Sequence, residues 1–377
     1  MAFHRVALRA VWAVVLVVLV VLGGSAALPA SFAAVLRTSS SGAGPIGQSR
    51  GLTACDITTT GRIVAVGDVH GAFDTYVAIL REAQLIDSRR RWIGGNALLI
   101  QLGDVLDRGT ESRQVLDLIR RLETEAPKAG GGVLFLLGNH EVMRMQGDFR
   151  DVHPDEYKAF LSRDAEPLRE RLYEHLVAQG SATARAKGEK FDERDFRKKF
   201  LADIPLGSVE MQIAFSESGE YGPWLRGHEV MARVNGIAFV HGGPGVRAAA
   251  AGCAGTNARI RTEIKTVKLT DPDYADSLIW SPEGPLWHRG LVGGSPASTG
   301  EEVTAVLKAL DASRIVVGHT VSPTKSIVAH HNGRVFQIDT GMLGGATYPG
   351  GVPSALEIQG GTFLAIYQGK REVVFPK

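Results

Sequence analysis

The chain has 377 residues, of which 44% are hydrophobic, 22% are charged and two are cysteine. This composition excludes a disordered protein, a collagen-like repeat and a small disulfide-rich domain, and the length allows one large domain or two of medium size. The net charge is +2, and the excess comes from Arg5 and Arg9, so the remainder of the chain is neutral. Because a neutral body has no excess of basic surface for a polyanion, we expect no nucleic-acid partner.

Residues 1–34 have the pattern of an export signal. Two arginines precede Ala10–Leu22, a run of thirteen residues without a polar side chain, and small residues follow up to Ala33 and Ala34. This order is typical of a secretory signal that is cleaved after the small residues. We therefore expect this segment to engage the secretion machinery and the protein to be exported, either periplasmic or secreted. An uncleaved membrane anchor is the alternative, because no charge appears from Ala10 through Leu36.

A linker at residues 35–59 leads into a domain at residues 60–377, where short apolar runs alternate with amphipathic stretches. This alternation predicts an α/β fold, and the closely spaced final runs predict an antiparallel C-terminal part of the sheet. We expect strands at Arg62–Val66, Ala97–Leu102, Val133–Leu137, Ile237–Val240, Ile315–Val317, Val335–Ile338, Ala355–Ile358, Phe363–Tyr367 and Glu372–Phe375, and helices at Ala72–Leu85, Glu111–Glu125 and Glu301–Leu310.

One stretch differs from the rest in its charge content. Arg150–Asp203 carries 12 basic and 12 acidic residues and few β-branched ones. This pattern predicts charged surface helices around Glu156–Gln179 and Glu193–Ala202. We interpret the stretch as a solvated helical insertion, at about residues 146–228, rather than as a dedicated surface for a partner or a nucleic acid.

The two cysteines, Cys55 and Cys253, do not have the spacing of a metal site or a redox pair. In an oxidising compartment they can form one disulfide, and two separate thiols are the alternative. The sequence leaves both open.

Residue types that bind metals follow five of the expected strands, at the point where each strand ends. Asp, Asn and His offer oxygen and imidazole donors, which suit manganese, iron or zinc rather than a thiolate-bound metal. The carboxyl ends of strands form the ligand-binding edge of an open α/β sheet, and adjacent glycines let the backbone approach a ligand closely. The segments are Gly67–Gly71 (GDVHG), Gly103–Gly109 (GDVLDRG), Gly138–Glu141 (GNHE), His241–Gly243 (HGG) and Gly318–Thr320 (GHT).

Together and in this order, these five segments resemble the phosphoprotein phosphatase superfamily of calcineurin-like metallophosphoesterases. Two further segments, Tyr221–Arg226 and Gly284–Arg289, resemble its Shewanella-like phosphatase branch, as does the 102-residue separation between Asn139 and His241. The resemblance covers about residues 60–345. It implies a four-layer α+β fold, in which two β-sheets pack as a sandwich flanked by helices and the metals lie at one edge.

The resemblance implies a metal-dependent phosphomonoesterase with two divalent cations, manganese by preference and iron or zinc as alternatives. Asp68, His70 and Asp104 would hold the first cation. The second would be held by Asp104, which bridges the two, together with Asn139, His241 and His319. Arg108, Arg289 and Asn139 would bind the substrate phosphate, and His140 would act as the general acid, oriented by Asp107.

The expected substrate is a phosphorylated protein, on Ser/Thr or Tyr, or a small phosphoester, hydrolysed by direct attack of a hydroxide that bridges the metals. A dinucleoside polyphosphate hydrolase of the diadenosine tetraphosphate type is the alternative activity. A non-catalytic binding module is less favoured, because every ligand, arginine and acid position is intact. Tyr348, in the glycine-rich loop after Asp339-Thr340-Gly341, either lines the cleft or belongs to a simple turn.

Overall fold

The computed structural model describes residues 55–294 and 296–376. The predicted export signal and nearly all of the predicted linker lie outside these residues. None of the helices within the described ranges is both long and apolar enough to cross a membrane. The described chain divides into two compact units. One contains residues 154–221 and 268–272, and the other contains residues 55–153, 222–267 and 273–376.

The larger unit contains a six-stranded mixed sheet. Its first three strands in chain order, β1 to β3, are parallel, so their carboxyl ends meet at one edge. The three C-terminal strands pair antiparallel with one another and with β1, which confirms the predicted antiparallel part of the sheet. The order across the sheet is β11 (Lys370–Phe375), β10 (Thr362–Tyr367), β9 (Ala355–Gln359), β1 (Ile63–Val66), β2 (Leu98–Gln101) and β3 (Gly132–Phe135).

The second sheet of this unit has five strands. Its three central strands, β5, β6 and β8, are parallel, and the two edge strands run antiparallel to their neighbours. The edge strands were not expected from the sequence, because neither is an uninterrupted apolar run: Arg233 interrupts β4, and β7 ends at His330. The order is β4 (Met231–Val234), β5 (Ile237–Val240), β6 (Arg314–Val317), β8 (Val335–Gln337) and β7 (Val328–His330).

The two sheets share one apolar core. Ile63 and Leu98 of the first sheet and Phe239 of the second belong to the same buried cluster. Phe336 on β8 stacks on Phe363 on β10, with ring centroids 4.2 Å apart. Side chains from both sheets therefore interdigitate, and each large one contributes about 1.5–3 kcal/mol by leaving water.

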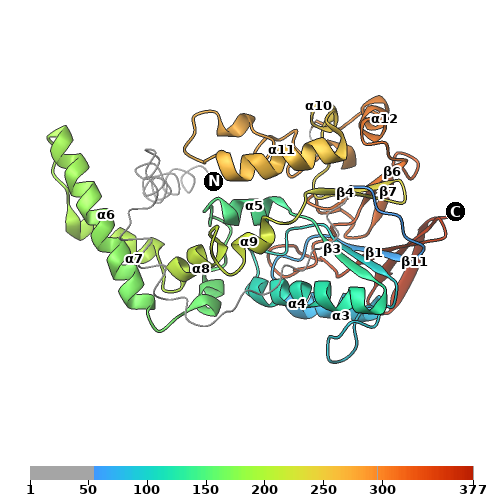
Figure 1. Ribbon diagram of the computed structural model, residues 1–377, viewed down its shortest axis with the longest axis horizontal. Coiled ribbons are helices and arrows are strands. Elements are labelled where there is room, and N and C mark those ends of the chain that lie inside the picture. Colours follow the sequence, from blue (N-terminus) through green and yellow to red (C-terminus); the bar gives the residue numbers. More distant parts are fainter. Residues whose placement is uncertain (1–54, 295, 377) are drawn as a thin grey trace. The chain divides into compact units, whose positions relative to one another are not determined.

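Helices cover the outer faces of the sandwich, which confirms the predicted arrangement (Figure 1). On α4, the buried positions Val115, Leu118, Ile119 and Leu122 recur at helical spacing, so one face packs on the six-stranded sheet. The helices on that side are α3 (Phe73–Glu82) and α4 (Ser112–Glu125). The helices beside the second sheet are α10 (Val246–Ala249), α11 (Gly252–Thr266) and α12 (Gly300–Ala309). Short 3₁₀ turns lie at Ala126–Ala129, Tyr274–Asp276 and Gly290–Val292.

The smaller unit is helical and has its own core. Leu172, Tyr173 and Leu176 of one helix pack against Phe200 and Val209 of the next two. The long helix expected around residues 156–179 is instead a 3₁₀ turn followed by a separate helix that continues to Lys187 and ends at Gly188, which has a φ of 70°. The elements are η2 (Pro154–Phe160), α6 (Ala165–Lys187), α7 (Glu193–Asp203) and α8 (Ser208–Phe215).

Cys55 and Cys253 form a disulfide, which resolves the alternative left open by the sequence. The bond attaches the segment that precedes β1 to the N-terminal turn of α11. Next to it, Ile57 forms a parallel bridge with Val234 on β4, so the start of the described chain is fastened to the edge of the second sheet.

Candidate metal centre

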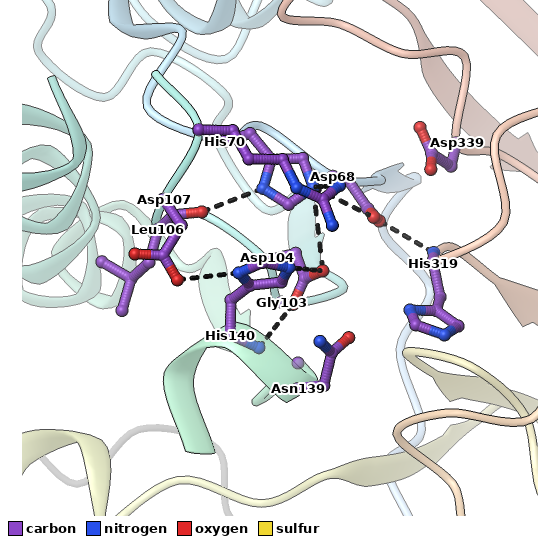
Figure 2. A network of polar contacts seen from close by, with 12 residues as sticks. Asp68, His70, Gly103, Asp104, Leu106, Asp107, Asn139, His140, His319 and Asp339 are labelled. Carbon is purple, nitrogen blue, oxygen red and sulfur yellow. Dashed lines mark hydrogen bonds and ion pairs between the residues drawn. The ribbon is translucent and has the colours of Figure 1, made fainter. Parts of the chain in front are cut away.

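The carboxyl ends of β1, β2, β3, β5 and β6 converge, and the loops that follow them carry the candidate site (Figure 2). The structure brings all ten of the site residues expected from the sequence to this edge. Eight of them are at most 6% exposed. These are Asp68, His70, Asp104, Asp107, Asn139, His140, His241 and His319.

The backbone at this edge is held in unusual conformations. His70, Asp104, Asp107, Arg108 and His319 all have positive φ values, between 48° and 67°. Each such residue costs about 1–3 kcal/mol and persists only where its surroundings impose the conformation, and such strain concentrates at functional sites. β1 ends at Val66, and the turn that follows it brings the side chains of Asp68 and His70 together.

Two groups of side chains close enough to share a cation meet at Asp104. His70, Asp104 and His140 form one group, and Asp104, His241 and His319 form the other, with the ligand atoms of each group within 4.8 Å of one another. Asp104 Oδ2 lies 3.2 Å from His241 Nε2, 3.7 Å from His140 Nε2 and 3.8 Å from His70 Nε2. Asp104 is the residue common to both groups, as expected for a bridging ligand.

Asn139 and Asp68 lie beside these groups. Asn139 Oδ1 is 3.0 Å from His241 Nε2, which places the amide oxygen in the second group. Asp68 Oδ2 is 3.8 Å from His70 Nε2, and Asp68 Oδ1 accepts a hydrogen bond of 2.9 Å from the His319 backbone N–H. Asp68 therefore links the loop after β1 to the loop after β6.

Hydrogen bonds to the backbone orient two of the imidazoles. His70 Nδ1 donates to the Leu106 carbonyl (2.9 Å), and His241 Nδ1 donates to the Leu102 carbonyl (2.7 Å). Both rings consequently turn Nε2 toward the centre, which is the arrangement that metal-binding histidines use. His319 Nε2 is buried and has no hydrogen-bond partner among the described residues.

Burial and neighbouring charges shift the pKa values of the carboxylates at the centre. Burial raises the pKa of Asp68 well above its usual range, and the carboxylate of Asp339 raises it further. Burial also opposes ionisation of Asp104, but the neighbouring histidines, His241 first, hold its pKa well below its usual range. Carboxylate, amide and imidazole donors with an unpartnered buried nitrogen fit divalent cations such as manganese, iron or zinc.

His140 is held by a carboxylate that is itself held by an arginine. His140 Nδ1 donates to Asp107 Oδ2 (2.7 Å), and the other oxygen of Asp107 accepts from the buried guanidinium of Arg144. Burial lowers the pKa of His140, but the carboxylates of Asp104 and Asp107 outweigh burial and raise it overall. Arg144 was not expected from the sequence, although it lies only four residues after His140 on α5 (Asn139–Met145).

The two arginines expected to bind phosphate lie at the rim of the centre. The Arg108 guanidinium donates to the Tyr348 hydroxyl, and Arg108 Nη1 donates to His70 Nε2 (3.0 Å). Tyr348 therefore belongs to the site and not merely to a turn. Arg289 is exposed, and its Nη1 donates to the His319 carbonyl (2.7 Å) and to Thr320 Oγ1 (3.1 Å), so it lies beside the second group.

Two buried carboxylates, Glu141 and Asp339, were not assigned a role from the sequence. Glu141 accepts hydrogen bonds from the backbone N–H groups of Asp104, Val105 and Gly138. Both residues follow a strand, β3 for Glu141 and β8 for Asp339, and an acidic residue beside a strand end was the signal available for each.

A sandwich of two sheets with a buried centre of oxygen and imidazole donors, flanked by two arginines, defines a metal-dependent phosphoester hydrolase. The chain belongs to the calcineurin-like phosphoesterase family, whose pattern matches residues 61–323. The divalent metal ions and the hydrolytic phosphatase class expected from the sequence agree with this family and with the two ligand groups.

The chain is similar to several known proteins over most of its length. It is 29% identical to Shewanella-like protein phosphatase 1 of Plasmodium berghei over 80% of this chain and 73% of that protein. It is also 29% identical to Shewanella-like protein phosphatase 2 of Arabidopsis thaliana, over 79% and 75%. The fold resembles that of a cold-active protein-tyrosine phosphatase of a Shewanella species, with a TM-score of 0.64 and 23% identity over 87% of this chain and 84% of that one.

Proposed function

We propose that this phosphoesterase removes phosphate from phosphorylated proteins and that manganese is its preferred metal. The observation that carries the proposal is the position of Asp104, which is shared by two buried ligand groups. The proton donor His140 lies 3.7 Å from Asp104, between Nε2 and Oδ2. The names of the two protein phosphatase relatives support a protein substrate.

The residues that would hold the cations share Asp104 with the two groups, but the first set takes Asp68 in place of His140, whose Nδ1 donates to Asp107. Asp68, His70 and Asp104 would hold one cation, and Asp104 with Asn139, His241 and His319 would hold the other. When bound, the cations would lower the pKa of a coordinated water and neutralise charge on the phosphoryl oxygens. The donors contain no thiolate, which favours manganese over softer metals.

The protein's own side chains supply the remaining steps. Arg108 presents a planar, permanently charged guanidinium that can bind two phosphoryl oxygens, and Arg289 can do the same from the other side. Asp107 holds the His140 ring by Nδ1, so that Nε2 points into the centre. A proton on His140 Nε2 can then pass to the leaving oxygen of the ester. No side chain needs to become phosphorylated.

The proposal is tested by metal content and substrate preference. Purified protein is stripped with a chelator, reloaded with manganese, iron or zinc, and assayed for phosphate release from phosphoserine, phosphothreonine and phosphotyrosine peptides and from diadenosine tetraphosphate. We expect manganese-dependent activity on at least one phosphopeptide. Faster hydrolysis of the dinucleotide than of every peptide would contradict the protein substrate.

Asp104→Asn provides the matched site variant, because it is nearly isosteric and removes the charge that both ligand groups share. It should abolish turnover and lower the bound metal while leaving the fold intact. Glu301→Gln, a change at an exposed position of α12, serves as the control and should keep full activity. Near-normal turnover of Asp104→Asn would contradict a centre with two cations.

We further propose that the protein is exported. The basic, apolar and small-residue order of residues 1–34 supports this address, and the disulfide between Cys55 and Cys253 suits an oxidising compartment. N-terminal sequencing should find a mature chain that begins near Val35 in a periplasmic or extracellular fraction. An intact Met1 in the membrane pellet would instead favour the anchor.

A further inference from the structure

Asp339 is a buried carboxylate that the proposed chemistry does not use. It lies two residues after β8 and is 1% exposed. One of its oxygens, Oδ1, accepts a hydrogen bond from the Gly341 N–H (2.9 Å), and its backbone carbonyl accepts from the Ser322 N–H (2.8 Å). These bonds hold the start of the glycine-rich loop in place and account for one carboxylate oxygen only.

The other oxygen, Oδ2, is buried and has no hydrogen-bond partner among the described residues. Figure 2 shows the Asp339 carboxylate turned toward the centre, on the side of Asp68 and above His319. No ion pair is formed by Asp339 within the described ranges, although a buried carboxylate without a counterion is costly. The side chains of Asp339 and Asp68 interact directly, and the Asp68 carboxylate is also negative.

Two facing carboxylates are stable when a cation lies between or beside them. Asp68 Oδ2 already faces His70 Nε2 at 3.8 Å, on the side where the first cation would bind. Three carboxylates, from Asp68, Asp104 and Asp339, would bring three negative charges against the four positive charges of two divalent cations. The centre would then keep a small positive excess that suits a phosphate dianion.

We propose that Asp339 is a further carboxylate of the metal centre and that its Oδ2 strengthens the cation site formed by Asp68 and His70. The inference rests on the proposed metal-dependent function. It adds a carboxylate from the loop after β8, which is not one of the five strand-end segments that carry the other ligands. Because Asp339 begins the glycine-rich loop, a cation bound at its Oδ2 would also help to hold in place the loop that carries Tyr348.

The experiment compares Asp339→Asn with a neighbouring control variant. Asparagine keeps an oxygen that can accept from the Gly341 N–H but removes the charge at Oδ2. Thr340→Val is the control, because it removes the hydrogen bond from Thr340 Oγ1 to the Val352 carbonyl (2.6 Å) and disturbs the same loop without a change of charge. Asp339→Ser, which is neutral and also offers an acceptor, is measured in parallel in case the first variant does not fold.

Manganese is titrated calorimetrically into each chelator-treated protein, and the melting temperature is recorded with and without manganese. For Asp339→Asn we expect one of the two ions to bind at least tenfold more weakly and the metal-induced rise in melting temperature to shrink. The metal-free variant should be at least as stable as the metal-free wild type, because the repulsion with Asp68 is gone. Thr340→Val should bind both ions like the wild type.

Manganese affinity of Asp339→Asn or Asp339→Ser within twofold of the wild type would overturn the inference while leaving the proposed function in place. An equal loss of affinity in Thr340→Val would also overturn it, since loop geometry would then explain the effect. A wild-type protein that binds no divalent metal would overturn the proposed function itself, so the two failures are distinguishable.

Discussion

Glu141 and Asp104 hold each other in place through backbone groups. The Glu141 carboxylate accepts a hydrogen bond from the Asp104 N–H (2.8 Å), and Asp104 Oδ1 accepts one from the N–H of His140, the residue before Glu141 (3.0 Å). The two backbones approach so closely at Gly138 that a Cβ there would lie 2.5 Å from the Asp104 backbone nitrogen. The loop after β2 and the first turn of α5 therefore form one rigid support for the residue shared by both cation sites.

Glu141→Gln should destabilise the protein and weaken metal binding. Its carboxylate accepts from three backbone N–H groups, and the glutamine amide would place a donor against at least one of them. Loss of a charged acceptor for buried donors costs about 1.5–3 kcal/mol. Urea unfolding of the metal-free proteins measures the loss in the free energy of unfolding. The control is Glu301→Gln, at an exposed position, which should change that free energy by less than about 0.5 kcal/mol. Equal stability of the two variants would contradict the supporting role.

His140→Asn should slow the hydrolysis of esters in proportion to how much the leaving oxygen needs a proton. Phosphoserine hydrolysis should fall most, by about 10²–10⁴-fold, phosphotyrosine less, and a nitrophenyl ester least. Asp107→Asn should show the same order with smaller losses, because Asp107 only orients the ring. The measurement is kcat/KM for the three esters at saturating manganese. Equal losses for all three esters in His140→Asn would show that His140 is not the acid.

Arg108→Ala should slow all three esters by about the same factor, because the guanidinium acts on the phosphoryl group that they share. Tyr348→Phe removes the hydroxyl that accepts from Arg108 but leaves the arginine in place. We therefore expect the same uniform pattern with a smaller loss, expressed mainly as a higher KM. A Tyr348→Phe effect confined to one leaving group would instead place the tyrosine against the leaving group.

Removal of the disulfide should lower stability without changing the active site. Cys55 and Cys253 are 198 residues apart in the sequence, so the bond closes a long loop in the unfolded chain. Its loss in the double variant Cys55→Ala/Cys253→Ala should cost about 3–5 kcal/mol in urea unfolding, with kcat unchanged. A reducing agent should lower the wild-type midpoint to that of the variant and leave the variant unaffected; a wild-type midpoint insensitive to reduction would argue against the bond.

The ligand types at the strand ends could be predicted because each depends on a short stretch of sequence. Apolar runs predict buried strands, and a glycine followed by Asp, Asn or His marks where each run ends, so Asp68, Asp104 and Asn139 were found without tertiary information. The same local logic predicted α4, whose apolar positions recur at helical spacing. Edge strands β4 and β7 lack such a pattern, because Arg233 interrupts the apolar run of β4 and β7 ends at His330.

The contacts that complete the site could only come from the tertiary structure. Arg108 and Tyr348 are 240 residues apart, and nothing in either segment indicates the other. Arg144 follows His140 by one helical turn, but its pairing with Asp107 depends on how α5 packs against the loop after β2. The unpartnered oxygen of Asp339 appears only when β8 is placed beside β6. The sequence alone determined which donor each strand end carries, whereas charge balance and hydrogen-bond partners depend on distances between segments that only folding sets.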